Sequence, residues 1–326
     1  MSTQQENYLQ QRIDKDSSYK NLLQFPKYFE IETVNACNAR CPMCTIGDWK
    51  RKTPTMETGL FKKIADEIAE NRETVKRVSL YRDGEPLLDK KLPDRITYLK
   101  EKQIKRVGIA TNVSLLGKTR ARNILEAGID EVILSVDSLQ KPVFEEMRAG
   151  LNFETVRENA EEFIKLRNQI NPTTSIWMRM VAGDKNLNEW PEYEKYWGPK
   201  LSDNDRLYYH SMHNWGGQVK LNKSAFSYEP SRPCVALWSL MVIFGNGDVP
   251  LCNIDYNNKF PTGSVINKSI ESIWQSKVNQ ERRDQHMNGQ KSKISLCTNC
   301  NVWDEQLEHE IEGDYFGENK EIPITV

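Results

Sequence analysis

Short runs of β-branched and aromatic residues alternate with longer amphipathic stretches through the first two thirds of the chain. Between these runs, apolar residues recur every three or four positions, as at Leu60, Ile64 and Ile68, which predicts helices with one buried face. Alternating strands and helices form a parallel sheet covered by helices. The pattern therefore predicts an α/β fold with a partial (β/α)6 TIM barrel. Its six expected strands cover residues 28–35, 75–82, 106–112, 131–137, 174–181 and 207–215.

This alternation stops after residue 215, and a different module begins there. Residues 240–252 predict two short strands joined by a tight turn, because the Asn-Gly pair at 246–247 favours a hairpin. Residues 269–285 predict one helix with a shared apolar face, formed by Ile270, Ile273, Trp274 and Val278. We expect three parts, namely an N-terminal arm (1–27), the barrel (28–215) and a small C-terminal domain (216–326).

Composition and charge exclude several classes of protein. The chain has 45 Lys and Arg against 46 Asp and Glu, so no overall field favours nucleic acid or an acidic membrane. Residues 1–20 lack the basic start and apolar run of a signal peptide, and no apolar run approaches the roughly 18 residues of a membrane span. We expect a cytoplasmic protein. Its seven cysteines, an odd number in a reducing compartment, predict metal ligands or reactive thiols rather than disulfides.

Three cysteines gather directly after the first predicted strand. Cys37, Cys41 and Cys44 form a C-x3-C-x2-C motif, and three thiolates this close can bind three irons of a 4Fe-4S cluster while leaving the fourth iron open. A zinc site is the alternative. Structural zinc sites normally have four ligands, and the nearest histidine here is far along the chain. The residues therefore favour an iron-sulfur cluster.

This loop resembles the signature loop of the radical S-adenosylmethionine (SAM) superfamily. The resemblance implies that the open iron binds the amino and carboxylate groups of SAM, and that one electron from the cluster then yields a 5′-deoxyadenosyl radical that abstracts hydrogen from carbon. It also implies contacts to SAM from residues in later loops. Each of these residues taken alone could be an ordinary turn or surface residue, but they occur along the chain in the same order as in the family. These contacts are Met43 near adenine, Gly84 and Glu85 in a Gly-Gly-Glu-like turn, Thr111 and Asn112 in a Thr-Asn-Gly-like turn, and Ser135 with Arg148 at the carboxylate.

Two positions depart from the family pattern. Asp83 stands where the first glycine of the Gly-Gly-Glu turn is usual, and Val113 stands where the glycine of Thr-Asn-Gly is usual. The first departure leaves Asp83 available for another role, as a proton acceptor, a partner for a substrate hydroxyl or a cap of the turn. The second predicts a stiffer backbone after the third strand.

The remaining four cysteines provide enough thiolates to ligate every iron of a second 4Fe-4S cluster. They follow the pattern C-x17-C-x44-C-x2-C, which resembles the twitch module, a shortened relative of SPASM domains. Ligation by cysteine alone favours electron transfer over direct substrate binding. A structural zinc site is the alternative, because four thiolates also suit zinc. The four residues are Cys234, Cys252, Cys297 and Cys300.

Polar residues near the end of the sixth predicted strand mark a candidate substrate pocket. His210 and His213 are candidate bases because imidazole titrates near neutral pH, although a histidine on a strand is more often structural. Arg179 is a further candidate because it is charged on an otherwise apolar strand. Its alternative role is a buried ion pair with an acid such as Asp137.

These features predict a radical SAM enzyme that oxidises a hydroxyl-bearing carbon of a polar small molecule, a sugar or cyclitol, with the second cluster as electron acceptor. The cysteine spacing is similar to that of 2-deoxy-scyllo-inosamine dehydrogenases, and aminoglycoside epimerases share the architecture. An external electron donor such as flavodoxin or ferredoxin is implied. The alternatives are radical epimerisation, which usually needs a spare cysteine as hydrogen donor, radical modification of a peptide or protein side chain, and a non-enzymatic electron carrier or zinc-stabilised binding protein.

Overall fold

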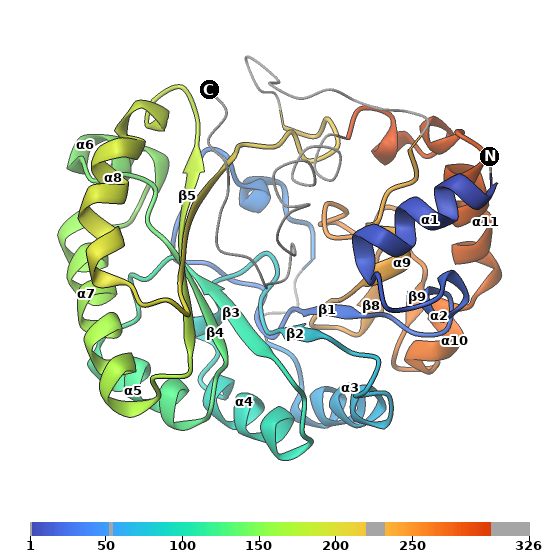
Figure 1. Cartoon of the computed structure of the whole chain (residues 1–326), viewed down its shortest axis with the longest axis horizontal. Coiled ribbons are helices and arrows are strands. Elements are labelled where there is room, and N and C mark those ends of the chain that lie inside the picture. Colours follow the sequence, from blue (N-terminus) through green and yellow to red (C-terminus); the bar gives the residue numbers. More distant parts are fainter. Residues whose placement is uncertain (1, 52–54, 220–231, 301–326) are drawn as a thin grey trace.

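A computed structural model describes residues 2–51, 55–219 and 232–300, and its central feature is a curved, parallel sheet of seven strands (Figure 1). The strands lie in the order β6-β5-β4-β3-β2-β1-β7. All six predicted barrel strands are present, although most are shorter than predicted because their polar ends belong to the loops. The strands are β1 (Tyr28–Ile31), β2 (Arg77–Ser79), β3 (Val107–Thr111), β4 (Glu131–Ser135), β5 (Ser175–Ala182), β6 (Arg206–Ser211) and β7 (Leu240–Ile243).

Helices cover the outer face of this sheet, so the predicted partial barrel is confirmed (Figure 1). Their apolar faces pack inward, as in α3, where Phe61, Ile64 and Ile68 are buried. Local sequence sets where they begin: the Asn152 side chain accepts a hydrogen bond from the Thr155 amide and caps the longest helix. These helices are α3 (Thr58–Glu70), α4 (Leu92–Glu101), α5 (Lys118–Glu126), α6 (Lys141–Met147), α7 (Phe153–Ile170) and α8 (Trp190–Trp197).

The two strands predicted over 240–252 are present, but the hairpin pairing between them is wrong. β7 pairs in parallel with β1 and so extends the barrel sheet, whereas β8 (Asp248–Val249) pairs antiparallel with β9 (Gly263–Ser264). The predicted turn does form, with Gly247 at a φ of 85° and the Phe244 amide donating to the Asp248 carbonyl. A tight turn determines only the direction in which the chain continues after β7. β7 buries more apolar surface beside β1 than it would beside β8, which has only two residues.

Residues 269–285 form two helices rather than the single predicted one, α10 (Ile270–Trp274) and α11 (Lys277–Met287). Ser276 lies between them in an extended conformation, and its hydroxyl accepts a hydrogen bond from the Asn279 amide. A serine that caps a new helix in this way ends the preceding one. Ile270, Ile273 and Trp274 are buried as predicted, but Val278 follows the break and is 41% exposed.

The N-terminal arm forms two helices, α1 (Ser2–Ile13) and α2 (Tyr19–Leu22), that pack beside the C-terminal module with α9 (Ala236–Ser239) (Figure 1). Leu9 and Leu22 are fully buried in an apolar cluster that includes Trp238. The indole of Trp238 donates to the Tyr19 hydroxyl at 3.1 Å. Segments 220–231 and 301–326 of the predicted third part lie outside the described residues, and the domain boundaries stay predictions. Every helix in the described ranges is too short or too polar to cross a membrane.

Candidate active site

The loops after the carboxyl ends of the barrel strands enclose a cavity of about 280 Å³. Polar residues from all six predicted units line this cavity. Sheets of this kind bind their ligands at the same position, beyond the carboxyl ends of the strands. The structure thus brings together the first cysteine motif and every predicted SAM contact and catalytic candidate, although their individual roles stay predictions. The lining includes Cys37, Cys41, Cys44, Met43, Asp83, Gly84, Glu85, Thr111, Asn112, Ser135, Arg148, Arg179, His210 and His213.

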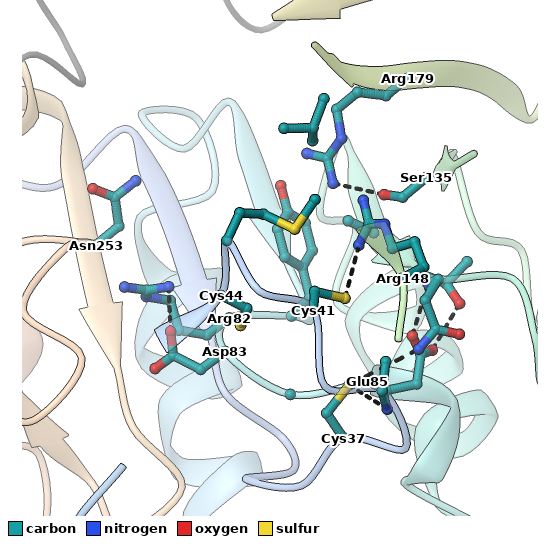
Figure 2. A pocket seen from close by; sticks show the side chains of 18 of the residues that line it. Cys37, Cys41, Cys44, Arg82, Asp83, Glu85, Ser135, Arg148, Arg179 and Asn253 are labelled. Carbon is teal, nitrogen blue, oxygen red and sulfur yellow. Dashed lines mark hydrogen bonds and ion pairs between the residues drawn. The ribbon is translucent and has the colours of Figure 1, made fainter. Parts of the chain in front are cut away.

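Hydrogen-bond donors surround the sulfurs of the three-cysteine loop. The Cys37 sulfur accepts from the Ala39 amide at 3.4 Å and from the Asn112 side chain at 3.9 Å. Arg148 points its Nη1 at the Cys41 sulfur, also at 3.9 Å (Figure 2). Burial raises the pKa of Cys37 and raises that of Cys44 to about 11, so these thiols release protons when they bind a metal. Such donors stabilise thiolate ligands.

Gly84 allows the loop after β2 to lie directly against the loop that carries the cysteines. A Cβ at this position would be 2.4 Å from the Val34 carbonyl oxygen and 2.6 Å from that of Ala36. The next residue, Glu85, then donates its amide to the Ala36 carbonyl at 2.8 Å. Only glycine permits this approach. The resulting cradle is the feature expected of a turn whose backbone holds a ligand beside the cluster.

Replacing Gly84 with alanine is expected to move the cysteine loop. Because the new methyl group would overlap two backbone oxygens, we expect a loss of about 1–3 kcal/mol in unfolding free energy and weaker SAM binding. Gly59 is a matched control, since a Cβ there meets nothing within 4 Å and alanine in helix α3 should stabilise slightly. Denaturant unfolding and SAM titration of both variants test this. Equal effects of the two changes would contradict it.

The Glu85 carboxylate joins the loops after β2 and β3. Its Oε1 accepts from the Thr111 hydroxyl at 2.7 Å, and its Oε2 accepts from the Asn112 amide at 2.8 Å. Burial raises the pKa of this carboxyl, and the hydrogen bonds oppose that shift. The predicted Gly-Glu and Thr-Asn turns therefore form one connected wall of the cavity.

Val113 adopts the backbone conformation that the usual glycine would favour. Its φ is 68°, in the left-handed region, and its side chain is fully buried. Asn159 holds the strained loop by donating to the carbonyl oxygens of Val113 and Ser114 at 3.0 and 3.1 Å. Such a conformation costs a β-branched residue about 1–3 kcal/mol. The departure from Thr-Asn-Gly thus adds strain at this position.

Two arginines at the cavity are held by different partners. Arg148 donates from Nε to Asp137 at 2.5 Å, and Asp137 also accepts from the Val181 amide. Arg179 donates from Nη2 to the Ser135 hydroxyl at 2.7 Å (Figure 2). The alternative in which Arg179 pairs with Asp137 is therefore wrong, because Arg148 occupies that acid. Within the described residues Arg179 makes no ion pair, and its Nε has no hydrogen-bond partner.

A buried charge network lies beside the cavity, and its central residue, Arg51, was missed from the sequence. Arg51 donates to both oxygens of Glu32 at 2.5 and 2.7 Å and to Asp83 at 2.7 Å. Arg82 donates to the other Asp83 oxygen at 2.6 Å and lies 3.5 Å from Glu30. Burial raises the pKa of Asp83 to about 6, and Arg82 opposes that shift. Asp83 therefore has both oxygens in ion pairs while it lines the cavity, and its catalytic role stays a prediction.

His210 is a neutral imidazole whose tautomer is set by the backbone. Its Nδ1 lies 3.0 Å from the Ser211 carbonyl oxygen, which can only accept, so Nδ1 carries the proton and Nε2 keeps a lone pair. Burial and the charge of Arg179 lower its pKa to about 4. Burial also lowers the pKa of His213 to about 3, and its Nδ1 has no partner in the described part of the chain.

The neutral state of His210 has a measurable effect on stability. The pKa of His210 is about 4 in the folded chain and about 6.5 in the unfolded chain. As the pH falls from 6.5 to 4, the unfolded chain therefore binds a proton that the folded chain does not bind. We expect the unfolding free energy of the wild type, relative to His210→Gln, to fall by up to about 3 kcal/mol between these pH values. Denaturant titrations across the window measure it. A difference independent of pH would show that His210 is solvated.

The other four cysteines line a second, smaller cavity together with His286 and Lys291. One of them, Cys252, directly precedes Asn253 and Ile254, which line the first cavity, so the two sites adjoin. In the described ranges, no three His, Cys, Asp or Glu side chains gather closely enough for a single metal ion. Four thiolates are the donor set of a 4Fe-4S cluster and also of a structural zinc ion.

Comparison with known proteins decides the family. Residues 31–193, half of the chain, match the family model of the radical SAM superfamily. The chain belongs to the radical SAM superfamily. Residues 234–301 match the SPASM model, an iron-sulfur cluster-binding domain. This radical SAM enzyme therefore uses SAM with one 4Fe-4S cluster and carries an auxiliary cluster in its SPASM domain, and the two cysteine sets described above fit these groups.

Individual relatives of this radical SAM enzyme differ in how much of it they match. The S-adenosyl-L-methionine-dependent 2-deoxy-scyllo-inosamine dehydrogenase of Niallia circulans is 24% identical over 87% of this chain and 96% of its own length. A probable GTP 3′,8-cyclase of Methanococcus maripaludis is 30% identical over 52% of this chain and 54% of its own. The chain spans about half the length of the first curated relatives it matches. A solved structure of BtrN with AdoMet and 2-DOIA has a TM-score of 0.59 at 23% identity, covering 85% of this chain and 93% of that one.

Proposed function

We propose that this radical SAM enzyme oxidises a hydroxyl-bearing carbon of a sugar or cyclitol to a carbonyl, with the auxiliary cluster as electron acceptor. The observation that carries the proposal is the extent of the cavity. It runs from the three-cysteine loop to Asn253 and Ile254, beside the auxiliary ligand Cys252, so a substrate within it lies between the two cluster sites. The similarity to 2-deoxy-scyllo-inosamine dehydrogenase over most of both chains supports the same reaction type.

The residues around the cavity suit the proton chemistry of this reaction. When bound, the first cluster with SAM supplies a 5′-deoxyadenosyl radical, and the auxiliary cluster supplies a one-electron acceptor. An alcohol becomes a carbonyl when it loses one hydrogen atom, one proton and one electron. The lone pair on Nε2 of His210 can accept the hydroxyl proton. The charge of Arg179 favours the deprotonated hydroxyl, and its unpartnered Nε can donate to a substrate oxygen.

Replacing His210 with glutamine is expected to lower carbonyl formation by about 10²–10⁴-fold, because a general base contributes that much. The formation of 5′-deoxyadenosine should persist, so the two products become uncoupled. His213→Gln is the matched control, since that ring also lines the cavity but is not held by the Ser211 carbonyl. Product analysis by mass spectrometry measures both compounds. Equal losses in both variants would contradict the assignment of the base to His210.

The alternatives predict different products. Epimerisation needs a hydrogen donor such as a spare cysteine, and the seven cysteines divide into three around one cavity and four around the other. That division supports oxidation. Radical modification of a peptide or protein side chain is the alternative in another substrate class, and its product would be a modified peptide. We also propose that an external donor such as flavodoxin or ferredoxin reduces the first cluster.

Isotope transfer from labelled candidate substrates tests the proposal. Sugars and cyclitols with deuterium at each hydroxyl-bearing carbon are incubated with the reduced enzyme and SAM. We expect one labelled position to transfer deuterium to 5′-deoxyadenosine and to yield a carbonyl at the same carbon. Solvent hydrogen at an inverted carbon, without a carbonyl, would support the epimerase instead. Deuterium transfer from a peptide and from no sugar would overturn the proposed substrate class.

A further inference from the structure

A buried histidine faces the auxiliary cysteines, and the sequence motifs assign it no role. His286 lies in the last turn of α11 and is fully buried. It lines the second cavity together with the four cysteines and the buried Lys291. Its surroundings are otherwise apolar, with Leu237, Leu251 and Ile254 on the same walls. A polar side chain in such a setting needs a hydrogen-bond partner.

The backbone determines which nitrogen of His286 carries a proton. The Cys234 amide donates to Nδ1 at 3.1 Å, so Nδ1 is the unprotonated nitrogen and Nε2 carries the hydrogen. Nε2 is buried and has no hydrogen-bond partner among the described residues. A buried N–H without a partner destabilises the fold, so this group implies an acceptor that belongs in the cavity. The sulfurs of an auxiliary cluster are the acceptors that the cysteine set supplies.

We propose that His286 donates an Nε2–H hydrogen bond to a sulfur of the auxiliary cluster and thereby raises its reduction potential. Hydrogen bonds to cluster sulfurs stabilise the reduced state, which carries the additional negative charge. The hydrogen bond from the Cys234 amide to Nδ1 fixes the orientation of the His286 ring. Nε2 therefore points away from that amide. A higher potential makes the cluster a better electron acceptor. That consequence for substrate oxidation rests on the proposed function, whereas the potential itself can be measured without substrate.

Redox titration of the holoenzyme, followed by electron paramagnetic resonance, tests the proposal. The auxiliary signal is the one that SAM does not perturb. His286→Phe removes the donor at similar volume, and we expect the equilibrium constant for reduction to fall about tenfold, which is about 59 mV for one electron. His286→Gln keeps an N–H donor and should recover most of the difference. Asp284→Leu, on the same helix but exposed, is the control and should leave the potential unchanged.

A measurement on the wild type covers the case in which a variant fails to fold. In protein labelled with ¹⁵N-histidine, we expect the reduced auxiliary cluster to couple to an exchangeable proton and only weakly to histidine nitrogen. Absence of the proton coupling would overturn the proposal. Strong nitrogen coupling would overturn it too, because it would show direct ligation. An unchanged reduction potential in His286→Phe with an intact cluster would also overturn the proposal. Failure of the substrate assay alone would bear on the proposed function and not on this hydrogen bond.

Discussion

Cys41→Ala is expected to abolish 5′-deoxyadenosine formation and to reduce the iron content from about eight to about four atoms per chain. Cys41 is the most buried of the three loop cysteines, and Arg148 points at its sulfur. Two remaining thiolates cannot hold a cluster with a single open iron. Iron analysis and chromatography of the anaerobically reconstituted variant measure both quantities.

Cys252→Ala is the matched control for this change, because it removes a predicted ligand of the other cluster at a similarly buried position. We expect the same loss of iron, while 5′-deoxyadenosine formation continues and the carbonyl product disappears. Radical formation that survives Cys41→Ala would contradict the assignment of this loop. Zinc in place of the second set of irons would contradict the auxiliary cluster.

Arg51→Met is expected to destabilise the fold by about 3–5 kcal/mol, the largest effect on stability among these changes. Removing one partner from a buried ion pair leaves an uncompensated charge, and the side chains of Glu32 and Asp83 are 0% and 1% exposed. Arg51 also donates to the Tyr256 carbonyl at 2.7 Å, so the change removes a link between the barrel loop and the C-terminal module. Chemical denaturation of the purified variant measures the loss.

Two further variants make this prediction specific. Arg122→Met removes an exposed pair with Glu126 on helix α5 and should cost less than about 0.5 kcal/mol. Adding Glu32→Gln to Arg51→Met removes the unpaired negative charge and should restore part of the stability. If the second substitution brings no recovery, the cost of losing Arg51 arises from packing against Phe244, whose ring lies 3.5 Å from the guanidinium.

The parts of this protein that follow local rules could be predicted from the sequence. Six strands and the polar residues at their ends follow from hydrophobic periodicity, because parallel strands bring successive loops to one edge. That rule was enough to place Thr111 and Ser135 on the same edge, whereas Arg148, which follows helix α6, was predicted from the family resemblance. The cysteine spacing then supplied the chemistry.

Features that depend on long-range pairing could not be predicted. Nothing near Arg51 in the sequence shows that it reaches Glu32 and Asp83, because the fold alone brings these charges together. The same holds for β7, whose partner β1 is some two hundred residues earlier. His286 was missed because one histidine on a polar helix has no pattern, and its tautomer depends on the amide of Cys234.

The pairing of β7 with β1 also bears on the rate of electron transfer. The first strand leads into the cysteine loop, and β7 leads through a tight turn to Cys252, so the two cluster sites are carried by hydrogen-bonded neighbours in one sheet. Electron tunnelling slows steeply as the separation between donor and acceptor grows. Two sites mounted on one rigid sheet keep that separation constant while loops and substrate move. Electron transfer between the two clusters should therefore proceed at a rate that does not depend on solvent viscosity.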